Sequence, residues 1–146
     1  MALKESTGLR NGMLVTGSLR SQLLNGFLKI YSGTAPASAD DAVTGTLLCT
    51  ISVSSTGTGI TLDTTASAGT VSKAPAETWS GVNAATGTAG YFRHVGSADT
   101  GASSTTQPRL QGDVATAGAE LNFTSVALTS GATQTVDYYN VALPTL

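Results

Sequence analysis

The sequence predicts an all-β protein: a jelly-roll-like antiparallel β-sandwich that follows an N-terminal arm and one short helix. Short apolar runs alternate with a period of two, and clusters of Gly, Ser and Thr separate them at turns. Only one stretch has a helical period. At 146 residues the chain is most simply one domain, with arm and helix in residues 1–26 and the sandwich in residues 27–146.

The N-terminal arm is predicted to be irregular over residues 1–17, where glycines interrupt it repeatedly. A helix of about two turns is predicted over residues 18–25, SLRSQLLN, with Ser18 as a candidate N-cap. Leu19 and Leu23 lie four residues apart, which places them on one apolar stripe. A helix this short is not stable alone, so we expect it to pack against another surface.

From residue 27 onward the pattern is that of short strands. The strands are predicted at 27–31, 46–53, 60–63, 69–73, 77–80, 88–95, 109–115, 120–128 and 133–143.

The strand at 46–53 has the clearest alternation. We expect Leu47, Cys49, Ile51 and Val53 to face the core and the opposite, mostly polar face to meet solvent. Spacing alone does not define strand topology, so an immunoglobulin-like arrangement stays open beside the jelly roll.

The composition argues against several classes of protein. Only 11% of the residues are charged, the net charge is −2 and the pI is about 5.1. A general nucleic-acid-binding protein needs a basic face, and a membrane span needs about 20 apolar residues; we predict neither partner. The lone Cys49 excludes an intrachain disulfide, and no export signal is expected after Lys4.

The first candidate for a catalytic site is the stretch GYFRHVGSADTG, residues 90–101, because it contains His94, the only histidine. On a strand, Tyr91 and Arg93 share one face, and Phe92 and His94 share the other. Catalysis by histidine needs a nucleophile or carboxylate within hydrogen-bond reach, and the sequence supplies no recognisable motif for one. We therefore predict a sheet histidine and no enzyme.

Metal and cofactor sites are not predicted either. Zinc needs about four close ligands, and the chain has one histidine and one cysteine, far apart. Asp40 and Asp41 lie together in a loop but lack the spacing of a calcium loop, so we interpret them as a solvated turn. No phosphate-binding glycine motif occurs, so no cofactor or small-molecule substrate is expected.

The aromatic residues raise one further alternative. Trp79 and Tyr91 could form a platform for a sugar, because aromatic faces stack on carbohydrate. With aromatic residues at only 5%, we expect the core to use most of them.

Three segments resemble small Thr/Ala/Gly-rich virion proteins of tailed bacteriophages, of the kind that decorate or cement the head. The resemblance covers most of residues 27–143 and does not extend to the N-terminal arm. The matching features are the strand Tyr91-Phe92-Arg93, the motif Leu110 to Val114, the motif Gly118 to Phe123 and the closing strand Gly131 to Val136.

The resemblance implies a non-enzymatic virion structural protein that binds the major capsid protein lattice in many copies. Such a protein is assembled in the host cytoplasm and lies on the capsid surface of the virion. Two alternatives stay open: a tail or head–tail connector subunit, and a carbohydrate-binding module.

The expected contacts follow from charge and patterning. Up to residue 29 the chain carries four basic side chains and one carboxylate, a net charge of +3. The candidate contacts with the lattice are Lys4, Arg10, Leu19, Arg20 and Leu23. A dimer or trimer of the chain itself is also expected, and its candidate interface residues are Tyr138 and Tyr139.

Overall fold

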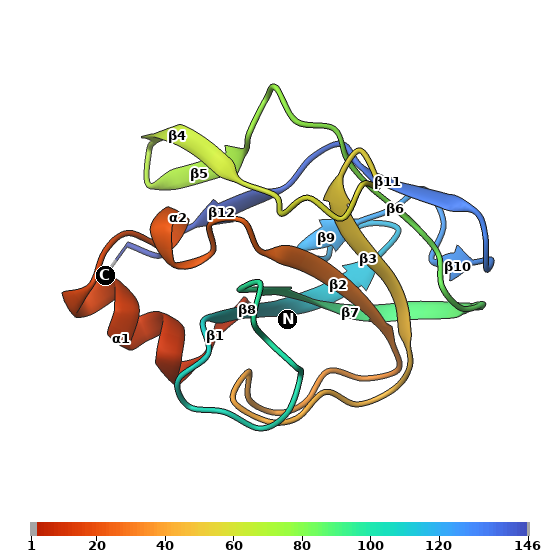
Figure 1. The fold of residues 1–146 in the computed structure, drawn as a ribbon, viewed down its shortest axis with the longest axis horizontal. Helices are drawn as coiled ribbons and strands as arrows, with labels where there is room; N and C mark the ends of the chain where they lie inside the picture. The colour runs from red at the N-terminus through yellow and green to blue at the C-terminus, as the bar shows by residue number, and fades with distance from the viewer. Residues whose placement is uncertain (1–2, 146) are drawn as a thin grey trace.

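The computed structural model describes residues 3–145, and β-strands in two sheets make up most of its regular structure (Figure 1). In chain order the elements are β1 (Lys4–Glu5), α1 (Thr7–Val15), α2 (Leu19–Gln22), β2 (Phe27–Ser32), β3 (Leu47–Val53), β4 (Leu62–Ser67), β5 (Thr70–Lys73), β6 (Trp79–Val82), β7 (Gly87–Val95), β8 (Arg109–Ala115), β9 (Leu121–Asn122), β10 (Ala127–Leu128), β11 (Thr133–Val136) and β12 (Asn140–Ala142).

The larger sheet has the strand order β1-β8-β7-β2-β3-β6-β11, with β10 paired to β7 and β9 paired to β8. The smaller sheet has the order β12-β5-β4. The strand pairs are antiparallel except β8 and β9, which are parallel. The predicted all-β, sandwich-like class is therefore confirmed, while the jelly-roll arrangement itself stays a prediction.

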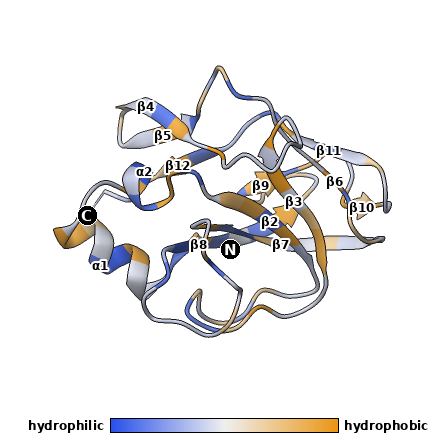
Figure 2. Ribbon diagram, viewed as in Figure 1, coloured by the Kyte–Doolittle hydropathy of each residue, from blue (hydrophilic) through white to orange (hydrophobic). Residues whose placement is uncertain are grey.

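The core lies between the two sheets and the helices. Figure 2 shows the hydrophobic colour concentrated on the central strands β2 and β3. Burial of these apolar faces is the main favourable contribution to folding. The largest apolar side chains of the core are Leu9, Leu23, Leu28, Ile30, Leu48, Ile51, Ile60, Trp79 and Phe92.

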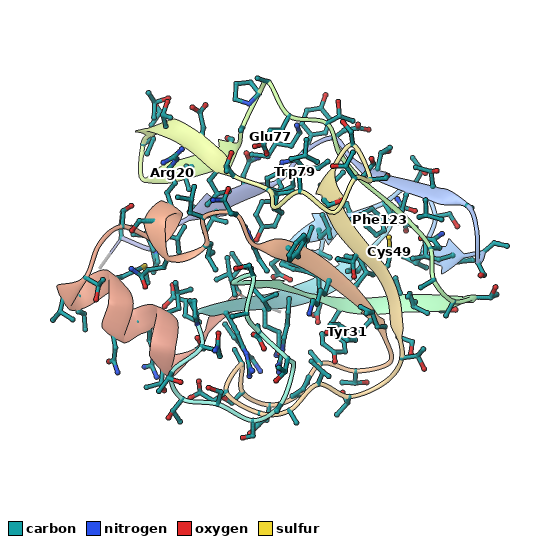
Figure 3. The ribbon with its side chains drawn as sticks, in the orientation of Figure 1. Arg20, Tyr31, Cys49, Glu77, Trp79 and Phe123 are labelled. Atoms are coloured by element: carbon teal, nitrogen blue, oxygen red, sulfur yellow. The ribbon has the colours of Figure 1, made fainter. Side chains whose placement is uncertain are left out.

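Trp79 joins the two sheets (Figure 3). Its indole N–H donates to Glu77 Oε2 at 2.8 Å, and Lys73 Nζ of β5 lies 5.8 Å from the ring centroid. Glu77 also accepts from the backbone and the hydroxyl of Thr61. This network fixes the loop before β4 against the start of β6.

β3 departs from its predicted two faces. Cys49 and Ile51 are buried as expected, but Leu48 and Ser52 on the opposite face are buried too. Leu47, expected in the core, is 37% exposed. A register shift against β2 between Ile30 and Tyr31 interrupts the alternation at this point, and Leu48 joins the same core cluster as Cys49 and Ile51.

The N-terminal segment is not the predicted irregular arm. Two helices occur where one was expected, and β1 pairs with β8 through Lys4 and Gln111. Leu9, Leu19 and Leu23 belong to the same core cluster as the strands. The boundary predicted after residue 26 is therefore not a break between separate parts of the structure.

Two long loops cover the outer face of β2, β7 and β8, namely residues 33–46 and 96–108, and they lie side by side in Figure 1. Backbone hydrogen bonds join them, from Val43 N–H to the Gly101 carbonyl and from Ser104 N–H to the Asp40 carbonyl. Among the described residues, neither helix has the length and apolar character needed to cross a membrane.

Candidate functional site

His94 lies in the core, on the β7 face that packs toward the smaller sheet. The side chain is completely buried, and Nδ1 lies 3.2 Å from the Tyr139 hydroxyl. Its ring meets the rings of Trp79 and Tyr139 edge-on, at centroid distances of 6.1 and 5.5 Å. Burial lowers the pKa of His94 from 6.5 to about 3, so the imidazole is neutral. The expectation of a sheet histidine is confirmed, and the ring is closed to solvent.

Arg93 projects to the opposite face of β7, as the alternation predicted. Its Nε donates to Gln111 Oε1 at 2.8 Å, and Nη2 donates to the Ser38 carbonyl at 3.4 Å. Beside it, the rings of Tyr31 and Tyr91 stack with centroids 5.1 Å apart. Arg93 and His94 therefore contact different layers of the protein and not each other.

Arg109 and Asp99 form a buried, two-pronged ion pair beneath the long loops. Arg109 Nε lies 2.6 Å from Asp99 Oδ2, and Nη2 lies 2.9 Å from Oδ1. The same guanidinium donates to the backbone carbonyls of Ala39 and Ala102. One side chain thus fixes both loops to β8, which explains why a charged group is buried here.

The carboxyl of Asp99 remains ionised despite its burial. Burial raises its pKa, but hydrogen bonds from Arg109 and the Gly101 N–H, with the charges of Arg109 and Lys29, outweigh this effect. The pKa of Asp99 therefore lies below its ordinary value of 3.8. The ion pair is intact at neutral pH.

The start of α1 is fixed by two capping groups. The Ser6 hydroxyl accepts from Leu9 N–H at 3.1 Å and donates to the Gln107 carbonyl at 2.7 Å. Asp40 receives the Thr7 N–H on Oδ1 at 2.8 Å and the Thr7 hydroxyl on Oδ2 at 2.6 Å. A carboxylate at a helix N-terminus is favourable because it meets unpaired N–H groups and the positive end of the dipole.

Asp40 is therefore not the solvated turn residue that the sequence suggested. The hydrogen bonds from Thr7 lower the pKa of its carboxyl from 3.8, and the nearby charge of Arg10 adds to this effect. Asp41 is exposed and accepts from Ser38 N–H within the loop, as expected of a turn.

Close backbone packing also holds α1 against the loop at residues 104–107. A Cβ atom on Gly8 would collide with the backbone carbonyl group of Thr106. At Gly12 a Cβ would meet only the end of the Gln22 side chain, which is flexible. The first turn of the helix, rather than its middle, is the part that lies flush on the rest of the protein.

The outward face of α1 carries large apolar side chains. Leu14 is 80% exposed and Val15 is 87% exposed, and Arg10, one turn before Leu14, is exposed as well. The hydrophobic colour at the end of α1 is visible in Figure 2. Adjacent exposed apolar residues on a rigid element are typical of surfaces that bind a partner.

The predicted lattice contacts separate into two groups. Arg10 is exposed, whereas Lys4 is half-buried and its Nζ donates to the Ala37 carbonyl at 2.8 Å; both line a shallow hollow together with Glu5. Arg20 is half-buried, and its Nε donates to the Leu62 carbonyl at 2.9 Å.

Leu19 and Leu23 were predicted wrongly as contact residues, because both are buried in the core. Their stripe packs inward, as a short helix requires, and so it is not available to a partner. The exposed apolar residues of this segment are Leu14 and Val15. They face outward because α1 packs on the core through Leu9, on the other side of the helix.

The two tyrosines predicted to form a subunit interface, Tyr138 and Tyr139, differ in exposure. Tyr138 is 86% exposed. Tyr139 is buried and packs on Phe92 and Trp79, with ring centroids 5.9 and 5.4 Å away, so its assignment to an interface was wrong. The sugar platform considered for Trp79 and Tyr91 is excluded in the same way, since both rings are buried.

Comparisons with protein-family models, with curated proteins and with solved structures gave no match to this chain. Within residues 3–145, no group of three or more His, Cys, Asp or Glu side chains is placed to hold a metal ion.

Proposed function

We propose that this chain is a non-enzymatic structural protein of a tailed-phage virion, most specifically a decoration or cement protein that binds the major capsid protein lattice in many copies. Two lines of reasoning support the proposal: the resemblance of its strand motifs to such proteins, and the outward face of α1. The chain would then act on the capsid surface, after assembly in the host cytoplasm.

The exposed face of α1 is the observation that carries the proposal. Leu14 and Val15 offer apolar area, and Arg10 adds a positive charge on the same side. Interface cores are enriched in apolar side chains and in arginine. Ser6 and Asp40 already hold the N-terminus of α1 in place before a partner binds. Binding through α1 therefore loses little conformational entropy.

Binding in many copies makes a small contact face sufficient. One short helix buries far less than the roughly 1,600 Å² of a standard interface. Contacts between neighbouring copies on a lattice raise the effective affinity by avidity, without any new contact to the capsid. A dimer or trimer of the chain would add such contacts.

Cryo-electron microscopy of particles purified from the source of the sequence tests the proposal. We expect hundreds of copies over the capsid surface, with α1 against the major capsid protein. A single ring at the portal or tail would instead support the connector alternative. Absence of the chain from the particles would overturn both readings.

A binding assay with two variants tests the role of α1. The double variant Leu14→Ser/Val15→Ser should occupy particles at least about tenfold less than the unaltered chain, because two apolar anchors are lost. Val82→Ser is the matched control, since Val82 is 54% exposed on β6 of the larger sheet. Equal occupancy by the double variant and the control would show that α1 is not the docking element.

A further inference from the structure

A hollow of about 330 Å³ opens beside β11, and neither α1 nor the predicted lattice contacts line it. Its walls come from Thr116 after β8, from residues 122–124 at the end of β9, and from Gln134, Thr135, Asp137 and Tyr138 in and just after β11. The buried ring of Phe123 lies at the hollow, and polar side chains with the ring of Tyr138 surround it. The volume is at the lower end of the range for small-molecule sites.

Tyr138 is an exposed ring on a fixed backbone. Its side chain is 86% exposed, while Val136 and Tyr139 on either side of it are buried in the core. The chain therefore holds the position of Tyr138 without covering its ring. An aromatic residue displayed in this way has no packing role in the fold, and its ring is free to stack on a ligand.

The polar groups at the hollow have unused hydrogen-bonding capacity. Within residues 3–145, the Asp137 carboxylate and the Tyr138 hydroxyl make no side-chain hydrogen bond or ion pair. Gln134 donates from Nε2 to the Thr135 carbonyl at 3.3 Å, which leaves its side-chain carbonyl free to accept. Two acceptor groups and a phenol therefore line one small hollow.

The charge at the hollow restricts the chemistry of its ligand. Asp137 is the one acidic residue among those that line the hollow, and none of them is basic. A phosphate or another anion would meet an unpaired carboxylate there, which is unfavourable. A neutral ligand rich in hydroxyl groups fits, because each hydroxyl donates to a carboxylate or an amide oxygen.

We propose that this hollow binds a neutral saccharide, with the C–H face of one sugar ring against Tyr138 and its hydroxyls bonded to Asp137 and Gln134. The arrangement combines an apolar contact with a few convergent polar groups, which is the usual composition of a small-ligand site. It differs from the platform suggested by the sequence, whose rings are buried. The inference is independent of a role in the virion.

The test is saturation-transfer difference NMR of the full chain with a panel of methyl glycosides of glucose, galactose, mannose and N-acetylglucosamine at millimolar concentration. A glycan array of neutral oligosaccharides accompanies it. We expect at least one neutral saccharide to receive signal, and titration of that sugar gives its affinity. Tyr138→Ala should weaken binding by about tenfold or more, and Tyr138→Phe should retain most of it. Asp137→Asn should reduce binding to a lesser extent, because an amide still accepts one hydrogen bond.

Thr65→Ala is the control, since Thr65 is an exposed residue of β4 on the smaller sheet. The folds of the variants are compared by circular dichroism, and we expect Tyr138→Ala to keep the fold because the ring is 86% exposed. No signal from any saccharide would overturn the proposal, as would equal binding by Tyr138→Ala and the unaltered chain. Sedimentation provides a further check: a dimer that Tyr138→Ala converts to a monomer, with no sugar bound, would assign the hollow to contact between copies instead.

Discussion

The burial of His94 predicts a loss of stability in weak acid. In the unfolded chain its imidazole takes up a proton near pH 6.5, whereas in the folded protein burial lowers the pKa to about 3. Between these two values the unfolded state binds more protons, so the free energy of unfolding decreases as the pH falls. The stabilisation is fully present above pH 6.5 and has been lost once the pH reaches about 3.

The size of the effect follows from the same two pKa values. Each pH unit between them is worth about 1.4 kcal/mol. Lowering the pH from 7 to 5 should therefore reduce the free energy of unfolding by about 2 kcal/mol, out of a total of about 5–15 kcal/mol for a domain. The chain has one histidine, and the reference pKa of a carboxyl group is about 4, so this pH range isolates the titration of His94.

Urea unfolding followed by the fluorescence of Trp79, the single tryptophan, measures the change. We expect the midpoint to decrease by about 1 M between pH 7 and pH 5, given typical dependences on urea. His94→Gln keeps a polar group near the Tyr139 hydroxyl but does not titrate, so its midpoint should be nearly constant over this range. The reasoning would be refuted by a flat profile in the unaltered protein, or by an equal slope in the variant.

Two further predictions concern the contacts that hold α1 and the long loops. Gly8→Ala should destabilise the protein by about 1–3 kcal/mol, because the collision of its Cβ with the loop backbone outweighs the roughly 1 kcal/mol gain in helix propensity. Gly12→Ala should be neutral or slightly stabilising, because its Cβ meets only the flexible end of a side chain. Urea unfolding distinguishes the two, and equal effects would argue against the close packing of the first turn. Asp99→Asn should cost about 3–5 kcal/mol in the same assay, because it leaves the buried guanidinium of Arg109 without its counter-charge. Asp137→Asn is the control on the surface, and a loss below about 1 kcal/mol for Asp99→Asn would contradict the role of the ion pair.

Local pattern was enough to predict the long central strands. The prediction for residues 109–115 agrees with β8, and that for residues 88–95 differs from β7 by one residue. In both segments apolar and polar residues alternate, and both lie inside the larger sheet. The sequence pattern and the tertiary packing therefore both favour a strand. The register of β3 was not predictable in this way, because a bulge against β2 depends on the partner strand.

The strands predicted over 120–128 and 133–143 are each broken into two short pieces. In both cases an aromatic residue at the interruption, Phe123 or Tyr139, turns into the core. Propensity favours a continuous strand in such segments, and the gain from burying a large ring overrides it.

The helix α1 and its capping were missed for a physical reason. The segment contains two glycines and ends on a β-branched residue, so its intrinsic helix propensity is low. Its stabilising partner is Asp40, which lies 33 residues further along the chain and is brought near Thr7 only by the fold. A contact of that sequence separation leaves no local signal.

The pairing of β1 with β8 has a consequence for the order in which the chain folds. Ser6 accepts a hydrogen bond from the backbone of Arg109, 103 residues away. At synthesis rates of about 5–20 residues per second, the N-terminal segment waits roughly 5 to 20 seconds on the ribosome before its partner strand exists. Ser6 therefore reaches its final contacts only after Arg109 has been made. A chain that ends before β8 lacks both this hydrogen bond and the β1–β8 pairing that hold the start of α1 in place.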